Sequence, residues 1–187
     1  LSCLERVDPM VPRSSSAAAE LTPLLVSACL LGDPVRYDAG HKWLGDERLA
    51  QWRDQGRLVP VCPEVAGGLP TPRPAAEIAG GSGAQVLAGE LRIVDIDGGD
   101  PTEAFVAGAR RALATARRYH CRLALLTDAS PSCGSTQVYD GRFSGSRIAG
   151  EGVTAALLRD AGIEVFAPHQ LEELARRLVE LDTDRRR

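Results

Sequence analysis

The chain has 187 residues, of which 44% are hydrophobic and 25% are charged, and its formal net charge at pH 7 is −3. This size and balance suit one globular domain and argue against a broad nucleic-acid-binding face. No apolar run approaches the ~20 residues that a membrane-spanning helix needs, so we expect no transmembrane helix.

Both ends of the chain are expected to lie outside the folded domain, which we place at residues 23–182 without a second-domain boundary. Residues 1–22 lack the apolar centre of a secretion signal and predict a flexible tail. Residues 183–187 end in three arginines and predict a solvated basic end. Five cysteines, an odd number in a chain too large for a small disulfide scaffold, favour a cytoplasmic protein with reduced thiols.

The first third of the chain alternates short apolar runs with polar segments. Strands are predicted over Leu24–Ala28 and Leu58–Val61 because these runs are apolar and of strand length. A helix is predicted over Glu47–Gln55, with Asp46 as its N-cap. The segment Gly67–Pro74 (GGLPTPRP) is too rich in glycine and proline for a regular element and predicts a stiff, extended loop.

The rest of the chain predicts a hairpin followed by alternating helices and strands. The hairpin is expected over Gln85–Asp97, turning at Ala88-Gly89-Glu90. The clearest helix should begin at Pro101 behind an Asp100 cap and run to about Tyr119. The remaining expected elements are a strand over Arg122–Thr127, a helix over Val153–Ala161, a strand over Ile163–Ala167 and a helix over Gln170–Asp182. Such alternation predicts an α/β fold with a mostly parallel sheet and one small hairpin insertion.

Three cysteines follow predicted strands, in the segments LVSACLLG, VPVCPEVAGG and LLTDASPSCG. These residues are Cys29, Cys62 and Cys133. Ligands of a parallel α/β sheet bind in the crevice outside the carboxyl ends of its strands, so we expect three thiols to meet there. Cys121 begins a predicted buried strand and is expected to be structural, and Cys3 belongs to the predicted tail.

The three cysteines together favour a metal or iron–sulfur site, although any one of them alone is typical of a buried structural residue. Structural zinc sites commonly use four ligands with paired C-x₂₋₄-C spacing, and no such pair occurs here. Three thiolates leave one coordination position open, on zinc or on one iron of a cluster, and an open position suits catalysis.

Polar residues near these cysteines are candidates for chemistry and for substrate binding. Glu64 is a candidate general acid or base, or else a surface carboxylate or helix cap. Ser130 and Ser132 flank Pro131 and are candidates to orient a carbonyl or thiocarbonyl, or else to bind local backbone. For Arg73 and Arg36 substrate binding and surface ion pairing remain equal alternatives.

These segments resemble the bacterial thiouracil desulfidase family, formerly a domain of unknown function. The matching stretches are VSACLLGDPVRYDAGHK, CPEVAGGLPTPRPAAEI, SPSCGSTQVYDGRFSG and GVTAALLRDAGIEVF, which together span about Leu24 to Phe166. The resemblance implies a Rossmann-like three-layer fold and a [4Fe–4S] cluster held by Cys29, Cys62 and Cys133. It also implies hydrolysis of 2- or 4-thiouracil to uracil and sulfide without net redox change. Glu64 matches the catalytic carboxylate, while Ser130 and Ser132 remain equal candidates for the catalytic serine.

One departure from the family pattern concerns charge: relatives usually carry a basic residue before SPSCG, whereas this chain has Thr127-Asp128-Ala129. Losing that charge is expected to alter substrate choice without removing a ligand.

Some relatives fuse this domain to another and act on 4-thiouridine in tRNA, but the net acidity of this chain favours a small free thiolated pyrimidine. The alternatives are a desulfidase of tRNA or nucleosides and a non-catalytic iron–sulfur or metal carrier. Iron–sulfur assembly machinery is an expected partner in each case.

Overall fold

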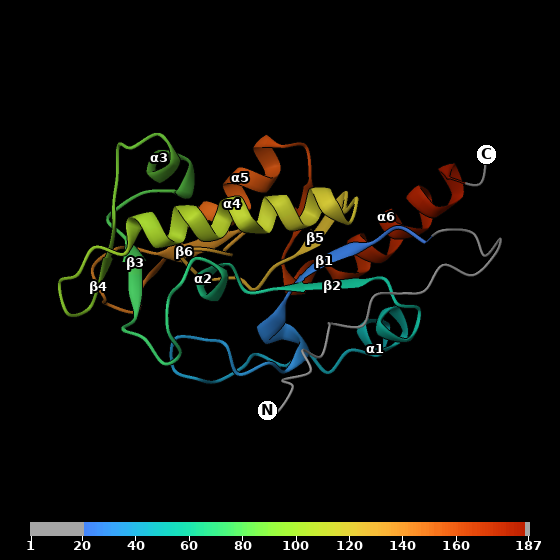
Figure 1. The fold of residues 1–187 in the computed structure, drawn as a ribbon, viewed down its shortest axis with the longest axis horizontal. Coiled ribbons are helices and arrows are strands. Elements are labelled where there is room, and N and C mark those ends of the chain that lie inside the picture. Colours follow the sequence, from blue (N-terminus) through green and yellow to red (C-terminus); the bar gives the residue numbers. More distant parts are fainter. Residues whose placement is uncertain (1–20, 186–187) are drawn as a thin grey trace, which may run out of the picture.

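The structure is a computed structural model that describes residues 21–185. Its main sheet has four parallel strands in the order β2-β1-β5-β8 (Figure 1). Two small antiparallel pairs, β3–β4 and β6–β7, stand apart from it. The strands are β1 (Leu24–Ser27), β2 (Leu58–Val61), β3 (Ala76–Ile78), β4 (Ile93–Asp95), β5 (Leu123–Leu125), β6 (Gln137–Tyr139), β7 (Arg147–Ala149) and β8 (Glu164–Phe166).

Helices connect the parallel strands and cover both faces of the main sheet. The α-helices are α1 (Glu47–Asp54), α2 (Pro63–Ala66), α3 (Gly83–Leu87), α4 (Thr102–Arg118), α5 (Val153–Asp160) and α6 (Leu171–Asp184). Two 3₁₀ turns, η1 (Ala28–Leu31) and η2 (Pro168–Gln170), follow β1 and β8.

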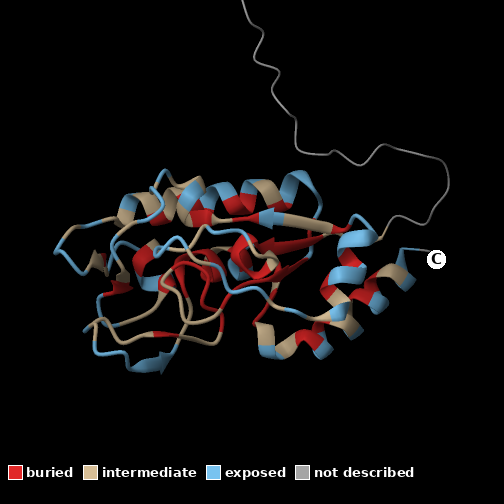
Figure 2. Cartoon of the chain, turned by 90° about the horizontal axis from the view of Figure 1, so that it is seen from below, coloured by how far each residue is buried: buried red, intermediate tan, exposed pale blue. Residues whose placement is uncertain are grey.

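The main sheet separates two apolar cores because side chains alternate across a strand. Leu24 and Val26 of β1 pack with α1 and α6 on one face, and Leu25 packs with α4 and α5 on the other. Figure 2 shows the buried residues concentrated in these central strands. This arrangement confirms the expected three-layer, Rossmann-like α/β fold with a mostly parallel sheet.

The order of the strands places a topological switch point between β1 and β5. The chain leaves β1 for β2 on one side and returns to β5 and then β8 on the other. A crevice therefore opens beyond the carboxyl ends of β1 and β5.

The hairpin prediction over residues 85–97 is wrong for the first of its two strands. Residues 83–87 form α3, and β4 pairs instead with β3. Backbone N–H of Ser82 donates to the Gln85 side chain at 3.1 Å. This Ser-x-x-Gln capping pattern was a helix signal in the sequence. The antiparallel β6–β7 pair was not expected.

The ends of the domain differ slightly from expectation. Thr22, placed in the tail, is fully buried, and its N–H donates to Asp182 Oδ1 at 2.7 Å. Helix α6 continues past the expected end at Asp182 to Asp184. Most of the predicted tail, including Cys3, and the last two arginines lie outside the described residues. Within residues 21–185 no helix is long and apolar enough to cross a bilayer.

Candidate functional site

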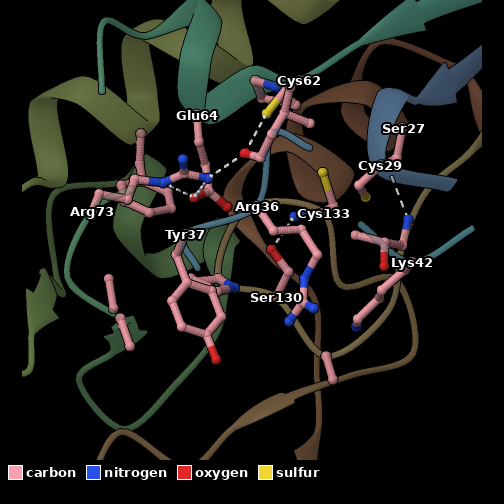
Figure 3. A pocket seen from close by; sticks show the side chains of 18 of the residues that line it. Ser27, Cys29, Arg36, Tyr37, Lys42, Cys62, Glu64, Arg73, Ser130 and Cys133 are labelled. Atoms are coloured by element: carbon pink, nitrogen blue, oxygen red, sulfur yellow. Dashed lines mark hydrogen bonds and ion pairs between the residues drawn. The ribbon is translucent and has the colours of Figure 1, made fainter. Parts of the chain in front are cut away.

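A cavity of about 340 Å³ lies at the crevice beyond β1, β2 and β5. Cys29, Cys62 and Cys133 all line it, although they are far apart in the sequence. In Figure 3 their side chains lie around the same space. The other walls come from the loop after η1, the loop before β3 and the β6–β7 pair.

Each cysteine is presented by a tight turn at the end of a strand. Cys29 lies in η1, whose chain reverses at Gly32 with a φ of 101°, a conformation that favours glycine. Cys62 is the N-cap of α2. Cys133 lies in a turn closed by the N–H of Gly134, which donates to the Ser130 carbonyl at 2.9 Å.

Helix α2 is held rigidly because it packs backbone to backbone against α4. A Cβ atom at Gly67 of α2's C-cap would collide with the carbonyl of Ala104, and one at Gly108 of α4 would collide with that of Pro63. Two glycines therefore allow the close approach that fixes Cys62 and Glu64 at the cavity.

All three cavity thiols favour the protonated form in the protein as described. Burial raises the pKa of Cys29 to about 11, and the pKa values of Cys62 and Cys133 are also raised mainly by burial. Thiolate ligation at this cavity therefore requires positive charge from a metal group.

The kind of donor at the cavity suits an iron–sulfur cluster, because Cys29, Cys62 and Cys133 all offer thiol sulfur. Among residues 21–185, no three His, Cys, Asp or Glu side chains are grouped closely enough to hold one metal ion. Zinc binds thiolates at about 2.3 Å, so its ligands must lie within about 4 Å of one another. In a [4Fe–4S] cluster each thiolate binds a different iron and can stand farther from the next. Three thiols around one cavity match that demand.

Glu64 lies in the first turn of α2 and lines the cavity with one oxygen already engaged. Its Oε2 accepts a hydrogen bond from Arg73 Nε at 2.7 Å and lies 2.6 Å from Arg73 Nη2 in an ion pair. Within the described residues no donor hydrogen-bonds to the other oxygen, Oε1. The negative charge of Glu64 also raises the pKa of Cys62 and Cys133, although burial is the larger cause for both.

Arg73 is positioned to orient Glu64 rather than to receive a ligand. Only 5% of its side chain is exposed. Besides Glu64, its guanidinium donates to the carbonyls of Val35 and Pro70 and to the Thr71 hydroxyl. Nearly all of its donors are thus occupied, and we assign it to holding the carboxylate in place.

The two serines of the SPSCG segment occupy different environments. Ser130 lines the cavity, and its Oγ accepts from the N–H groups of Ser132 and Cys133, both at 3.1 Å. With both acceptor positions used, its O–H remains to donate into the cavity. Ser132 is fully buried, does not line the cavity and pairs with the hydroxyl of Thr154 at 2.9 Å.

Positive charge reaches the cavity from Arg36, Lys42 and Arg147. Arg36 lies 5.3 Å from the centre of the Tyr37 ring and 3.4 Å from Asp38. Burial and the neighbouring arginines lower the pKa of Lys42, whose Nζ donates to the Asp128 carbonyl at 3.1 Å. Lys42 therefore brings a cation to the segment 127–129 that precedes SPSCG.

Several polar cavity residues were not singled out from the sequence as site candidates, among them Ser27, Lys42, Glu77 and Arg147. Glu77 is 7% exposed, and its Oε2 accepts from the N–H of Phe143 at 3.1 Å, which ties β3 to the β6–β7 turn. The one sequence signal for Ser27 and Thr127 was their position at the ends of predicted strands. Nothing in the local pattern marked Lys42 or Glu77.

The model of the 2-thiouracil desulfurase family matches residues 24–170. The uncharacterized protein YbbK of Bacillus subtilis (strain 168) is 43% identical over 151 residues, which are 81% of this chain and 99% of YbbK. The solved structure of the [4Fe-4S]-dependent thiouracil desulfidase TudS is 47% identical and superposes with a TM-score of 0.78, covering 84% of this chain and 98% of TudS. Sequence and fold thus agree over nearly all of the described residues, and the chain belongs to the 2-thiouracil desulfurase family.

Proposed function

We propose that this protein hydrolyses a small thiolated pyrimidine, such as 2- or 4-thiouracil, to the oxo form and sulfide. The cofactor would be a [4Fe–4S] cluster ligated by Cys29, Cys62 and Cys133. The observation that carries the proposal is the single cavity at which these thiols meet Glu64 and Ser130. Membership of the family and the likeness to TudS support it.

Three thiolates leave one iron of the cluster without a protein ligand. Such an iron supplies a soft Lewis acid that prefers the sulfur of a thiocarbonyl to the oxygen of uracil. The remaining tasks, which are to orient the ring, to activate water and to move protons, belong to the protein.

Glu64 is suited to move protons because one of its oxygens is fixed and the other is free. Arg73 holds Oε2, so Oε1 keeps a constant direction toward the cavity. Oε1 accepts a proton from the water that attacks the ring carbon and returns it to the departing sulfur. Oxygen from water replaces sulfur at carbon, and no electron is gained or lost overall.

Ser130 is the better of the two serine candidates for contact with the substrate. Its hydroxyl is held by two backbone N–H groups and donates into the cavity, where it can stabilise negative charge on a substrate heteroatom. Ser132 is enclosed against Thr154 and supports the turn that carries Cys133.

The test is turnover by anaerobically reconstituted protein without a reductant. With 4-thiouracil we expect equimolar uracil and sulfide over many turnovers. A reductant consumed in every cycle would contradict hydrolysis. Activity confined to intact tRNA would favour the RNA alternative, and cluster transfer to an acceptor protein without turnover would favour a carrier.

A further inference from the structure

A second carboxylate, that of Glu77 on β3, lies at the wall of the cavity. The next residue, Ile78, packs into an apolar core with Ile93 and Val138. Neighbouring residues of a strand point to opposite faces, so Glu77 is turned away from this core. It lines the cavity instead, and it is 7% exposed.

One oxygen of Glu77 is held by the backbone of a distant segment. Its Oε2 accepts from the N–H of Phe143, in the turn between β6 and β7, at 3.1 Å. This turn lies close against the end of β3, because a Cβ atom at Gly141 would collide with the Ile78 carbonyl. The direction of the carboxylate is therefore fixed by two segments that are far apart in the sequence.

The negative charge of Glu77 has no cationic partner in the part of the chain that the structure describes. Among residues 21–185 it takes part in no ion pair, and Phe143 is the one donor to its side chain. A carboxylate has about four acceptor positions, and a buried charge is costly unless it is paired. The other oxygen, Oε1, therefore calls for a donor that arrives with a ligand.

The cations that line the cavity do not supply this donor, because each is engaged with another group. The contacts are those of Arg36 with Asp38 at 3.4 Å, of Lys42 with the Asp128 carbonyl at 3.1 Å, and of Arg147 with the Tyr139 ring, whose centre lies 5.4 Å from the guanidinium carbon.

A thiolated uracil carries a donor of the required kind. Its N3–H lies next to the thiocarbonyl in both 2- and 4-thiouracil, so this N–H stays beside the sulfur whichever isomer binds. We propose that Glu77 is a specificity-determining residue whose Oε1 accepts a hydrogen bond from N3–H of the substrate ring. This inference rests on the proposed function and deepens it, because it assigns proton transfer and ring recognition to different carboxylates, Glu64 and Glu77.

The consequence is a defined substrate class. An ionised carboxylate can only accept hydrogen bonds, so it attracts an N–H and disfavours a ring nitrogen that has no hydrogen. The site therefore selects thiolated pyrimidines with an unsubstituted, protonated N3, and it tolerates substitution at N1.

The test compares 1-methyl-4-thiouracil with 3-methyl-4-thiouracil on anaerobically reconstituted protein. The two isomers have the same size, but only the 3-methyl compound lacks N3–H. We expect its kcat/KM to be about 10–100-fold lower than that of the 1-methyl isomer, because a buried carboxylate is left unpaired. In Glu77→Gln, which keeps an oxygen for Phe143, KM for 4-thiouracil should rise by a similar factor, kcat should change less, and the preference between the isomers should shrink.

Binding of the product gives the same comparison without turnover. Uracil also carries N3–H, so calorimetry should show that uracil and 1-methyluracil bind more tightly than 3-methyluracil. Glu77→Gln should weaken this preference. Glu77→Ala should weaken it as well, so the test does not depend on the folding of one variant.

Asp140→Asn is the matched control. The Asp140 carboxylate accepts from the N–H of Arg142 in the same β6–β7 turn, but it does not line the cavity, so this variant should keep the unsubstituted preference. Equal kcat/KM values for the two isomers would overturn the inference alone. An undiminished preference in Glu77→Gln would do the same, because the amide has the shape of the carboxylate and the rejection would then be steric. Unsubstituted protein without activity on 4-thiouracil would overturn the proposed function itself.

Discussion

Glu64 and Arg73 form an ion pair. The Arg73 guanidinium is buried and nearly all of its donors are hydrogen-bonded, whereas Glu64 keeps one carboxylate oxygen free. The exposed fractions of their side chains are 5% for Arg73 and 16% for Glu64. A surface ion pair would leave both groups mobile, whereas this one fixes the direction of a carboxylate at a cavity. Of the two alternatives left open for Arg73, the geometry shows the ion pair, and it leaves one oxygen of Glu64 free at the cavity.

Replacement of Glu64 by Gln should separate proton transfer from cofactor binding. The amide keeps an oxygen for Arg73 but cannot carry the proton, so we expect turnover to fall by roughly 10²–10⁴-fold with unchanged iron content. Steady-state kinetics and iron analysis measure the two effects. Glu164→Gln is the control, because Glu164 pairs with Arg177 at 2.8 Å away from the cavity. A near-normal rate in Glu64→Gln would assign the proton transfer to Ser130 or to water.

The ligand set is tested by single replacements of cysteine. Cys29→Ala, Cys62→Ala and Cys133→Ala should each lose the bound iron, because each removes one of the three cysteines that line the cavity among residues 21–185. Cys121 is buried like Cys29 and Cys133, but it precedes β5 at the other edge of the sheet and does not line the cavity. Cys121→Ala should therefore keep full iron and sulfide content. Full loading in any of the first three variants would refute the assignment.

The positions of Cys29, Cys62 and Glu64 at the cavity were predictable because they closely follow parallel strands, whereas Cys133 reaches it through a longer loop after β5. The separate environments of Ser130 and Ser132 were not, since two serines that flank one proline look alike in sequence. Lys42 was beyond prediction for another reason. It reaches the cavity through a loop whose path depends on hydrogen bonds to η1 and to the Asp128 carbonyl.

At the scale of elements, the turn that carries Cys133 depends on Asp128. The Oδ1 of Asp128 accepts from the N–H groups of Ser135, Thr136 and Gln137, and its Oδ2 accepts from the Thr136 hydroxyl. One carboxylate therefore organises the chain on the far side of Cys133. Asp128 is in this way a structural anchor of the turn.

Asp128→Asn should destabilise the protein in a pH-dependent manner. Burial alone would raise the pKa of Asp128, but the hydrogen bonds from Thr136, Ser135 and Gln137 outweigh it and lower the pKa to about 2. A lowered pKa stabilises the fold above the ordinary value of about 3.9, and this stabilisation is lost as the pH falls through about 2. We expect a loss of about 1 kcal/mol at pH 7, measured by urea unfolding, and a smaller difference in acid.

The control for this prediction is Asp140→Asn, which alters an exposed turn at the tip of the β6–β7 pair. It should change stability less at pH 7. An Asp128→Asn effect that stayed constant from pH 7 to pH 2 would show that shape, and not charge, is what the turn requires.

The short elements were the hardest to predict. Strands β1, β2, β5 and β8 follow from apolar runs that only a doubly covered sheet can bury. Helix α3 was mistaken for a strand because Val86 and Leu87 suit either structure and the Ser82–Gln85 cap was overlooked. Strand β3 has three residues, and its pairing with β4 depends on tertiary contacts that no local pattern encodes.

At the scale of the whole molecule, the cavity lies at the ends of three strands that are far apart in the sequence. The cysteines follow β1, β2 and β5, which are neighbours in the sheet, and Cys29 and Cys133 pack into cores on opposite faces of it. A group that ligates all three would bridge the ends of these strands and the two layers. Such a bridge can form only in the folded chain, so it couples cofactor binding to stability.

Cluster loading should therefore raise the melting temperature. A ligand present at about 100 times its Kd stabilises the folded state by about 2.7 kcal/mol, which for a chain of this size corresponds to roughly 5–10 °C. Anaerobic calorimetry of apo and reconstituted protein measures the difference. Cys121→Ala should keep this increment even if its absolute melting temperature falls, and Cys62→Ala should lose it. An increment that survived in Cys62→Ala would mean that the iron binds elsewhere, and equal melting temperatures of apo and loaded protein would mean that the cluster does not bridge the strands.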